Sequence, residues 1–290
     1  MAEELAVERM LSWLAEDIPF WDVTSELIPE GCECRAVIIA KEPGVAACVE
    51  EVALFMGRMG FEVKLNVRSG DEFEKGSELM EVRGSLRKLL QVERLVLNLL
   101  THACGVATAT RRAVEAARKA NPRVRVAATR KTLPGLRYFE KRAVEAGGGD
   151  THRMSLSDMV LIKDNHLKHF VSVRTAVEAA RRKASFATKV EVEVSSPEQA
   201  VEAAEAGADI VMLDNFSVEE VRAAVEALER AGLRDRVIVE VSGGITLENL
   251  KEYARAGPDV VSMGWLTHSA EAIDLSLEVV EVREPCGASR

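Results

Sequence analysis

Six short runs rich in β-branched residues recur through the second half of the chain, separated by stretches with helical periodicity. The runs are VRVAA (124–128), DMVLI (158–162), KVEVEV (189–194), DIVMLD (209–214), VIVEVSGG (237–244) and DVVSMG (259–264). Each run has polar or glycine residues at its C-terminal edge or directly after it. Alternating strands and helices predict an α/β fold in which a parallel sheet closes into a (β/α) barrel with its active site at the carboxyl ends of the strands. We expect an incomplete TIM-like barrel of six to seven strands.

The first part of the chain lacks this alternation. Strand-like segments at 34–40, 45–48, 61–67 and 78–83, with a helix at 50–59, predict an α+β layer. A helical region at 86–119, with a break expected at Gly105, links it to the barrel. We therefore expect an N-terminal α+β domain (1–104), a barrel domain (105–269), and a segment (270–290) that returns to the first domain. Residues 67–84 resemble half of a lipoyl hairpin without its presented lysine, so we interpret them as structural.

Composition restricts the class of protein. The chain has 290 residues, 47% of them hydrophobic and 29% charged, with a formal net charge of −9. That length suits a barrel with a smaller domain, and the apolar runs are far shorter than a membrane span. Five cysteines show neither zinc nor disulfide-scaffold spacing, and the acidic N-terminus does not resemble a signal peptide. We expect a cytoplasmic protein with reduced thiols and neither membrane nor nucleic-acid partners.

Five cationic or ionisable side chains gather in three neighbouring motifs, TRKTLPGLR (129–137), GGGDTHR (147–153) and LIKDNH (161–166). They are Arg130, Lys131, His152, Arg153 and Lys163. Any one of them alone could be a solvated surface cation. Their shared position, at strand ends or just before a strand, favours one anion-binding site, because the net charge of the chain would otherwise repel anions. Arginine suits bidentate carboxylate binding, and lysine supplies a point charge. His152 either donates to a carboxylate or packs as a buried polar residue.

Two carboxylates are predicted inside the barrel. In KVEVEV the valines alternate with Glu191 and Glu193. A barrel strand covered by helices has no solvated face, so the valines should pack outward and the glutamates should point inward. Buried carboxylates need cationic partners. Glu193, nearer the carboxyl end, is the candidate for function, and Glu191 is the candidate internal ion-pair partner. Asp214 ends the next strand in the same ring.

Glycine turns predict a phosphate site. Ser242, Gly243 and Gly244 follow a strand, and a helix is expected to begin at Thr246. Exposed N–H groups at such a turn bind phosphate, although a tight structural turn is the alternative. Gly264 provides a second close backbone approach, and His268 lies one helical turn beyond it. The glycines at 147–149 are expected to end a helix, and Asn165 and His166 to order the loop after Lys163.

The order of these motifs resembles the quinolinate phosphoribosyltransferase family, also called nicotinate-nucleotide pyrophosphorylase. TRKT-PG-R, GGG-HR, LIKDNH, EVEV, LDN, SGG and GxLTH occur in the family's order, preceded by EDIPFWDVTSELIP (16–29), ERLVLNLL (93–100) and GVATAT (105–110). The chain departs from the family pattern at three positions. Ala128 stands where an aspartate commonly precedes TRKT, Cys104 replaces a serine, and Trp21 replaces a glycine.

The resemblance implies a pentosyltransferase of NAD biosynthesis. Quinolinate would attack C1′ of phosphoribosyl pyrophosphate, giving nicotinate mononucleotide, pyrophosphate and CO₂. The implied catalytic residues are Glu193, Asp214, Lys131 and Lys163, with Glu193 and Asp214 acting directly or through Mg²⁺. The implied substrate-binding residues are Arg94, Arg130, His152, Arg153, Lys163, Ser242, Gly243, Gly244, Gly264 and His268. The resemblance also implies a homodimer in which Arg94 reaches the neighbouring subunit's site.

Three other interpretations stay open at this point. Lys163 at a strand end could form an imine with a carbonyl substrate. A degenerate homologue could bind anions without catalysis, although Glu193 and Asp214 beside an anion argue for a cation or metal. A related transferase could accept another pyridine or base.

Overall fold

The computed structural model describes residues 2–283, which form two compact units. The first comprises Met1–Ala109, Tyr138–Gly148 and Ala270–Arg290, and the second comprises Thr110–Arg137 and Gly149–Ser269. This division differs from the sequence-based one because α4 (Arg137–Ala146) falls almost entirely in the first unit. Its residues bind there: Arg142 Nε contacts Glu51 Oε1 at 3.2 Å, and Glu140 Oε1 contacts His102 Nε2 at 2.9 Å.

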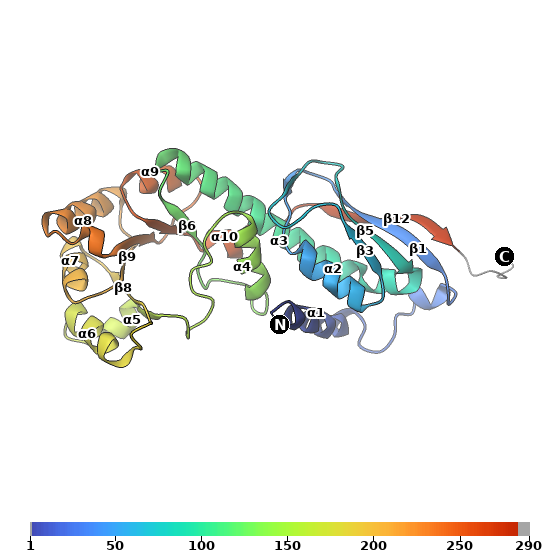
Figure 1. Ribbon diagram of the computed structural model, residues 1–290, viewed down its shortest axis with the longest axis horizontal. Coiled ribbons are helices and arrows are strands. Elements are labelled where there is room, and N and C mark those ends of the chain that lie inside the picture. The colour runs from blue at the N-terminus through green and yellow to red at the C-terminus, as the bar shows by residue number, and fades with distance from the viewer. Residues whose placement is uncertain (1, 284–290) are drawn as a thin grey trace. The chain divides into compact units, whose positions relative to one another are not determined.

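The first unit is an antiparallel sheet with helices (Figure 1). Its helices, besides α4, are α1 (Ala2–Asp17), η1 (Ser25–Leu27) and α2 (Val49–Arg58). Its strands are β1 (Glu33–Ala40), β2 (Gly44–Val45), β3 (Glu62–Leu65), β4 (Glu72–Phe73), β5 (Glu78–Ser85) and β12 (Leu275–Arg283). The main sheet has the order β12-β1-β5-β3, so the segment after residue 270 returns as an edge strand beside β1.

One helix, α3 (Leu86–Ala120), runs without interruption through Gly105, so the expected break there was wrong. The glycine has a packing role instead. A Cβ at this position would collide with the backbone carbonyl of Glu271 and lie 3.1 Å from Ala272 Cα. Gly105 therefore allows the segment that leads into β12 to approach the helix closely.

The second unit is the expected incomplete TIM-like barrel (Figure 1). Its strands are β6 (Arg125–Ala127), β7 (Val160–Ile162), β8 (Val190–Val194), β9 (Ile210–Asp214), β10 (Ile238–Ser242) and β11 (Val260–Ser262). They form one parallel sheet in the order β6-β11-β10-β9-β8-β7. Within residues 2–283, β6 and β7 are not paired with each other, and a single bridge joins Ala127 to Asp150. The barrel therefore has an open seam between β6 and β7.

Helices cover the outside of this sheet. They are α5 (Asp164–Leu167), α6 (Val173–Lys183), α7 (Pro197–Glu205), α8 (Val218–Arg230), η2 (Arg234–Arg236), α9 (Leu250–Arg255) and α10 (Trp265–His268). Serine side chains at 172, 196 and 217 cap α6, α7 and α8 by accepting backbone N–H groups. Val190, Val192 and Val194 pack in the same core as α6 and α7. The outward valines thus confirm the alternation predicted for KVEVEV.

The helix expected from Thr246 begins only at Leu250. Residues 246–249 form a turn instead, because Asn249 Oδ1 accepts the Thr246 N–H at 2.9 Å and its Nδ2 donates to the Gly244 carbonyl at 3.0 Å. The helix α9 is therefore short, and the glycine turn is fixed by a side chain rather than by a helix N-terminus.

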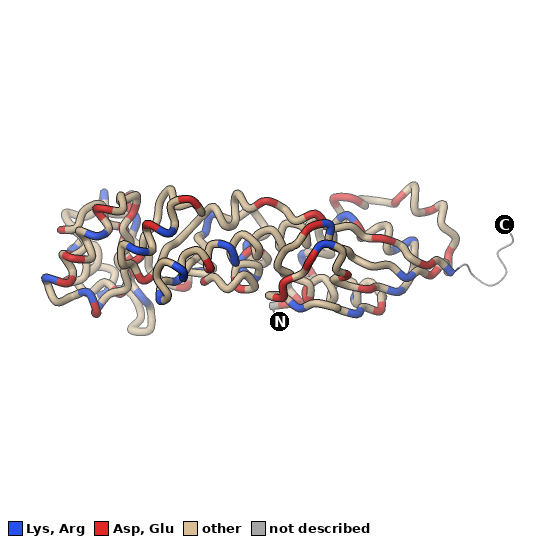
Figure 2. The backbone as a smooth tube through the Cα atoms, turned by 90° about the horizontal axis from the view of Figure 1, so that it is seen from above, with Lys and Arg blue, Asp and Glu red and all other residues tan. Residues whose placement is uncertain are grey.

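Two further observations concern the surface and the thiols. Acidic and basic residues alternate along the backbone of the described chain, as Figure 2 shows. No helix among the described residues has the length and apolarity needed to cross a membrane. Cys32, Cys34, Cys48 and Cys104 are buried free thiols, and Cys286 lies outside the described residues.

Gly105→Ala should destabilise the protein by about 1–3 kcal/mol, because the added methyl group must displace the backbone at Glu271. Gly57, in α2, is a matched control because a Cβ there meets no atom within 4 Å. Gly57→Ala should stabilise by about 0.5–1 kcal/mol through helix propensity. Urea unfolding measures both changes, and equal effects of the two substitutions would contradict the packing role.

Candidate active site

The polar interior of the barrel is arranged in layers. The strand register pairs Glu193 with Met212 and Met212 with Glu240, so the two glutamates occupy one layer. Glu191 lies one layer below, and Asp214 lies one layer above, opposite Ser242. Glu191, Glu193 and Glu240 are 0%, 7% and 1% exposed. These carboxylates are held inside because every second residue of a covered strand must point away from the helices.

A cavity of about 260 Å³ opens above these layers at the carboxyl ends of the strands. It is lined by Thr129, Arg130, Lys131, His152, Arg153, Leu161, Lys163, Glu193, Met212, Asp214, Glu240, Ser242 and Ser262. The structure thus brings together all five side chains of the predicted anion site with Glu193, Asp214 and Ser242. Gly243, Gly244, Gly264 and His268 do not line it, and Arg94 is an exposed residue of α3 in the first unit.

The side chains of Arg130, Lys131 and Arg153 have no acidic partner among residues 2–283. Arg130 Nε is buried and makes no hydrogen bond, and Arg153 is only 8% exposed. Burial and the neighbouring charge of Arg130 lower the pKa of Arg153. Like charges held together without a counter-charge favour binding of an anion. These three side chains are the anion-binding part of the cavity.

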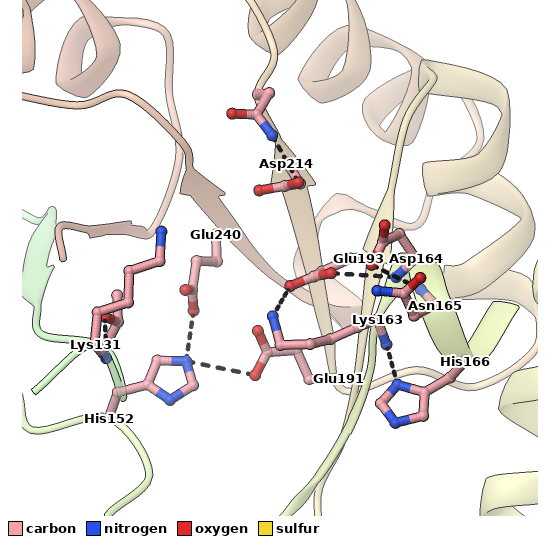
Figure 3. A network of polar contacts seen from close by, with 12 residues as sticks. Lys131, His152, Lys163, Asp164, Asn165, His166, Glu191, Glu193, Asp214 and Glu240 are labelled. Carbon is pink, nitrogen blue, oxygen red and sulfur yellow. Dashed lines mark hydrogen bonds and ion pairs between the residues drawn. The ribbon is translucent and has the colours of Figure 1, made fainter. Parts of the chain in front are cut away.

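Lys163 is neutralised within the protein (Figure 3). Its Nζ forms an ion pair with Glu193 Oε1, and the Asp164 N–H donates to Glu193 Oε2 at 3.3 Å. The loop that presents Lys163 is ordered as expected, because His166 Nδ1 accepts the Lys163 backbone N–H at 2.9 Å. Lys163 therefore positions Glu193 and offsets its charge, and it contributes less to anion binding than the unpaired cations.

His152 is also satisfied within the protein (Figure 3). Its Nε2 lies 3.1 Å from Glu240 Oε2 and 3.4 Å from Glu191 Oε2. Its Nδ1 accepts the backbone N–H of Arg153 at 2.8 Å. Burial opposes the charged ring, but the two carboxylates outweigh this effect and raise the pKa of His152. In contrast with the expected donation to a substrate carboxylate, neither ring nitrogen is free in this arrangement.

His152, Glu191 and Glu240 have the composition of a metal site, with one ligand atom from each within 4.8 Å of the others. The hydrogen bond at Nδ1 argues against a metal there. A nitrogen that accepts an N–H carries no proton, so the proton of the ring is on Nε2, the atom that would have to bind the metal. Burial raises the pKa of Glu191, whose oxygens make no hydrogen bond. We therefore describe Glu191 as a protonated acid and Glu240 as the carboxylate that accepts the Nε2 proton.

Asp214 is held by a residue that the sequence analysis did not select. Burial and the charge of Glu193 raise the pKa of Asp214. Asn215, in a left-handed conformation with φ 59°, donates from Nδ2 to Asp214 Oδ2 at 2.8 Å and from its backbone N–H to the Ser242 carbonyl at 2.8 Å. A Cβ on Gly243 would collide with the Asn215 carboxamide, so the turn requires glycine there. Asparagine after a strand end, a residue that tolerates this conformation, was the available signal.

Gly264 makes room for side chains rather than lining the cavity. A Cβ there would lie 2.8 Å from Lys131 Cδ and 3.3 Å from the ring of His268. Thr267 Oγ1 donates to the Lys131 carbonyl at 2.7 Å. The segment 264–268 therefore fixes the backbone and the aliphatic stem of Lys131.

Glu240 is the second functional residue missed from the sequence. VIVEVSGG has the same alternation of valine and glutamate that identified Glu191 and Glu193. Applying the same argument to this run would have placed Glu240 inside the barrel.

An incomplete parallel barrel with unpaired cations and carboxylates in one cavity defines an enzyme for polyanionic substrates. Residues 106–278 match the family described as quinolinate phosphoribosyl transferase, C-terminal domain, and residues 22–104 match its N-terminal domain. The chain is 48% identical over 264 residues to the probable nicotinate-nucleotide pyrophosphorylase (carboxylating) of Methanothermobacter thermautotrophicus, covering 91% of this chain and 95% of that protein.

The human nicotinate-nucleotide pyrophosphorylase (carboxylating) is 42% identical to the chain, with coverage of 92% and 89%. The crystal structure of NadC from Streptococcus pyogenes superposes with a TM-score of 0.88 at 36% identity and covers 96% of both chains. The chain belongs to the quinolinate phosphoribosyl transferase family.

Glu191→Gln should remove a pH dependence of stability. The folded state raises the pKa of Glu191 above its ordinary value of 4.5. As pH rises above that value, the unfolded chain loses a proton that the folded chain keeps, so the unfolding free energy of the wild type should fall relative to that of the variant. Urea unfolding between pH 5 and pH 8 measures the difference, and parallel curves would show that Glu191 is ionised when folded.

Proposed function

We propose that the protein transfers the phosphoribosyl group of phosphoribosyl pyrophosphate to quinolinate with decarboxylation, giving nicotinate mononucleotide, pyrophosphate and CO₂. The observation that carries the proposal is the division of charge within one cavity. Arg130, Lys131 and Arg153 lack counter-charges, whereas Glu193 and Asp214 line the same space. A dianionic acid and a phosphorylated sugar need the first group, and a developing sugar cation needs the second.

The chemistry uses electrostatic stabilisation and no protein nucleophile. The pyridine nitrogen attacks C1′ as pyrophosphate leaves, and Glu193 and Asp214 stabilise the positive charge on the ribose. The C2–carboxylate bond then breaks, and its electron pair stays on the ring carbon beside the cationic nitrogen. That carbon takes up a proton to give nicotinate mononucleotide. Lys163 holds Glu193 in place through their ion pair, and Lys131 faces the phosphates.

Arg130 and Arg153 bind the two carboxylates of quinolinate in this proposal. Their guanidinium groups are the least solvated cations of the cavity, and two carboxylates replace the missing counter-charges. The 5′-phosphate binds at the turn of Ser242, Gly243 and Gly244, with Gly264 and His268 on the adjoining loop. Gly243 and Gly244 have φ of 103° and 59°, which turns backbone N–H groups outward.

Mg²⁺ fits this site as an ion brought with pyrophosphate. Asp214 keeps Oδ1 free of protein hydrogen bonds, and Glu193 adds negative charge beside it. Both oxygens of Glu193 already have protein partners, so Glu193 would act through water. Magnesium commonly binds one or two carboxylates together with substrate phosphates and water. When bound, the ion would neutralise charge on the leaving pyrophosphate.

The ion pair of Lys163 counts against imine chemistry, because an amine held as an ammonium beside Glu193 is a poor nucleophile. A related base in place of quinolinate is separated by product analysis, as is anion binding without catalysis.

Quinolinate should be a far better substrate than nicotinate, each with phosphoribosyl pyrophosphate and Mg²⁺. Losing one charge-assisted carboxylate contact costs about 1.5–3 kcal/mol, roughly ten- to more than a hundredfold in kcat/KM. Chromatography of the nucleotide product and detection of CO₂ measure the reaction. Equal kcat/KM for the two acids would contradict quinolinate as the substrate, and absence of product with either would contradict catalysis.

The proposal includes a cytoplasmic homodimer in which each site takes Arg94 from the neighbouring subunit. Arg94 is exposed on α3 and has no acidic partner among the described residues. Arg94→Ala and Lys163→Ala proteins should each be nearly inactive. After co-refolding they should regain activity, since a mixed dimer contains one site with both residues intact. Mass spectrometry confirms mixed dimers, and no recovery in their presence would place Arg94 in its own subunit's site or in packing alone.

A further inference from the structure

We propose that Glu240 is a positioning residue that acts through the His152 ring to fix Arg153 for binding the dicarboxylate. The inference rests on the proposed function where it names that ligand. Its structural basis is one continuous set of contacts from β10 to an unpaired cation (Figure 3).

The contacts run through the imidazole. Glu240 Oε2 lies 3.1 Å from His152 Nε2, and His152 Nδ1 accepts the Arg153 backbone N–H at 2.8 Å. Because Nδ1 is an acceptor, the proton must be on Nε2, where it is donated to Glu240. The carboxylate selects this tautomer, and only this tautomer can hold the Arg153 backbone.

Arg153 needs such a support. It follows His152, whose φ of 52° is a strained conformation for a side chain of that size. Both residues belong to the segment at the open seam, where β6 and β7 are not paired and the bridge between Ala127 and Asp150 is the sheet contact described. The guanidinium is 8% exposed beside the like charge of Arg130. Repulsion would displace it unless its backbone were fixed.

Glu191 provides a matched control for Glu240. Both are buried carboxyl groups that face the same ring nitrogen, but Glu191 Oε2 is 3.4 Å away and makes no hydrogen bond. The proposal therefore assigns the positioning role to Glu240 alone.

A double-mutant cycle tests the proposal. Quinolinate binding is measured by calorimetry for the wild type, Glu240→Gln, Arg153→Ala and the double variant. The glutamine amide can donate to Nε2 and so permits the wrong tautomer. We expect Glu240→Gln to weaken binding about tenfold, the lower end for loss of an outer hydrogen-bond partner. In the Arg153→Ala background the same change should alter binding less than about twofold, because its effect passes through Arg153.

Two controls separate positioning from a general effect on the fold. Glu191→Gln should leave quinolinate binding within about twofold of wild type, and phosphoribosyl pyrophosphate binding should change little in Glu240→Gln. An equal loss in both Arg153 backgrounds, or an equal loss in Glu191→Gln, would overturn the proposal. If wild type binds no quinolinate, the proposed function fails, and the cycle is read with inorganic pyrophosphate as the anion.

A measurement on the wild type does not depend on the folding of any variant. Nitrogen-15 chemical shifts of labelled histidine report the tautomer, and His152→Gln identifies the resonance among five histidines. We expect a protonated Nε2 and an unprotonated Nδ1 near neutral pH. A proton on Nδ1 would overturn the proposal, because that ring could not accept the Arg153 N–H.

Discussion

The site depends on the need to satisfy carboxylates inside a parallel barrel. Outward valines on β8 place Glu191 and Glu193 in the interior, and the same alternation on β10 places Glu240 there. A lone charge in such a place costs several kcal/mol. Lys163 offsets Glu193, His152 joins Glu240, and Glu191 avoids the cost by keeping its proton. These pairings leave Arg130, Lys131 and Arg153 without partners, which makes them available to a substrate.

The distribution of partners also separates residues that bind from residues that support. Five side chains of one sequence cluster share a cavity, but two of them are paired with buried acids. The paired side chains order the carboxylates and the backbone at the seam, and the unpaired ones keep their charge for an anion. Asn215 and Thr267 provide similar support for Asp214 and Lys131 through hydrogen bonds of 2.8 Å and 2.7 Å.

Local pattern was sufficient where one physical rule acts alone. The six β-branched runs specified the strands, because β propensity and burial on both faces agree there. Alternation placed Glu191 and Glu193 inside. The rule failed where a neighbour distant in sequence decides the outcome. Gly105 looked like a helix break, yet it is helical because the backbone at Glu271 needs the space. Thr246 looked like a helix start, yet Asn249 forms a turn with it.

The sequence by itself determined the barrel, its polar interior and the group of cations beside it, since strand period and charge are local properties. It could not determine which cations are free. That result depends on which carboxylate lies within hydrogen-bonding distance of each donor, and β8, β10 and the segment of His152 meet only after the sheet has formed. Tertiary structure therefore decided that His152 supports Arg153, because a hydrogen bond of 2.8 Å at Nδ1 fixes the proton on the opposite nitrogen.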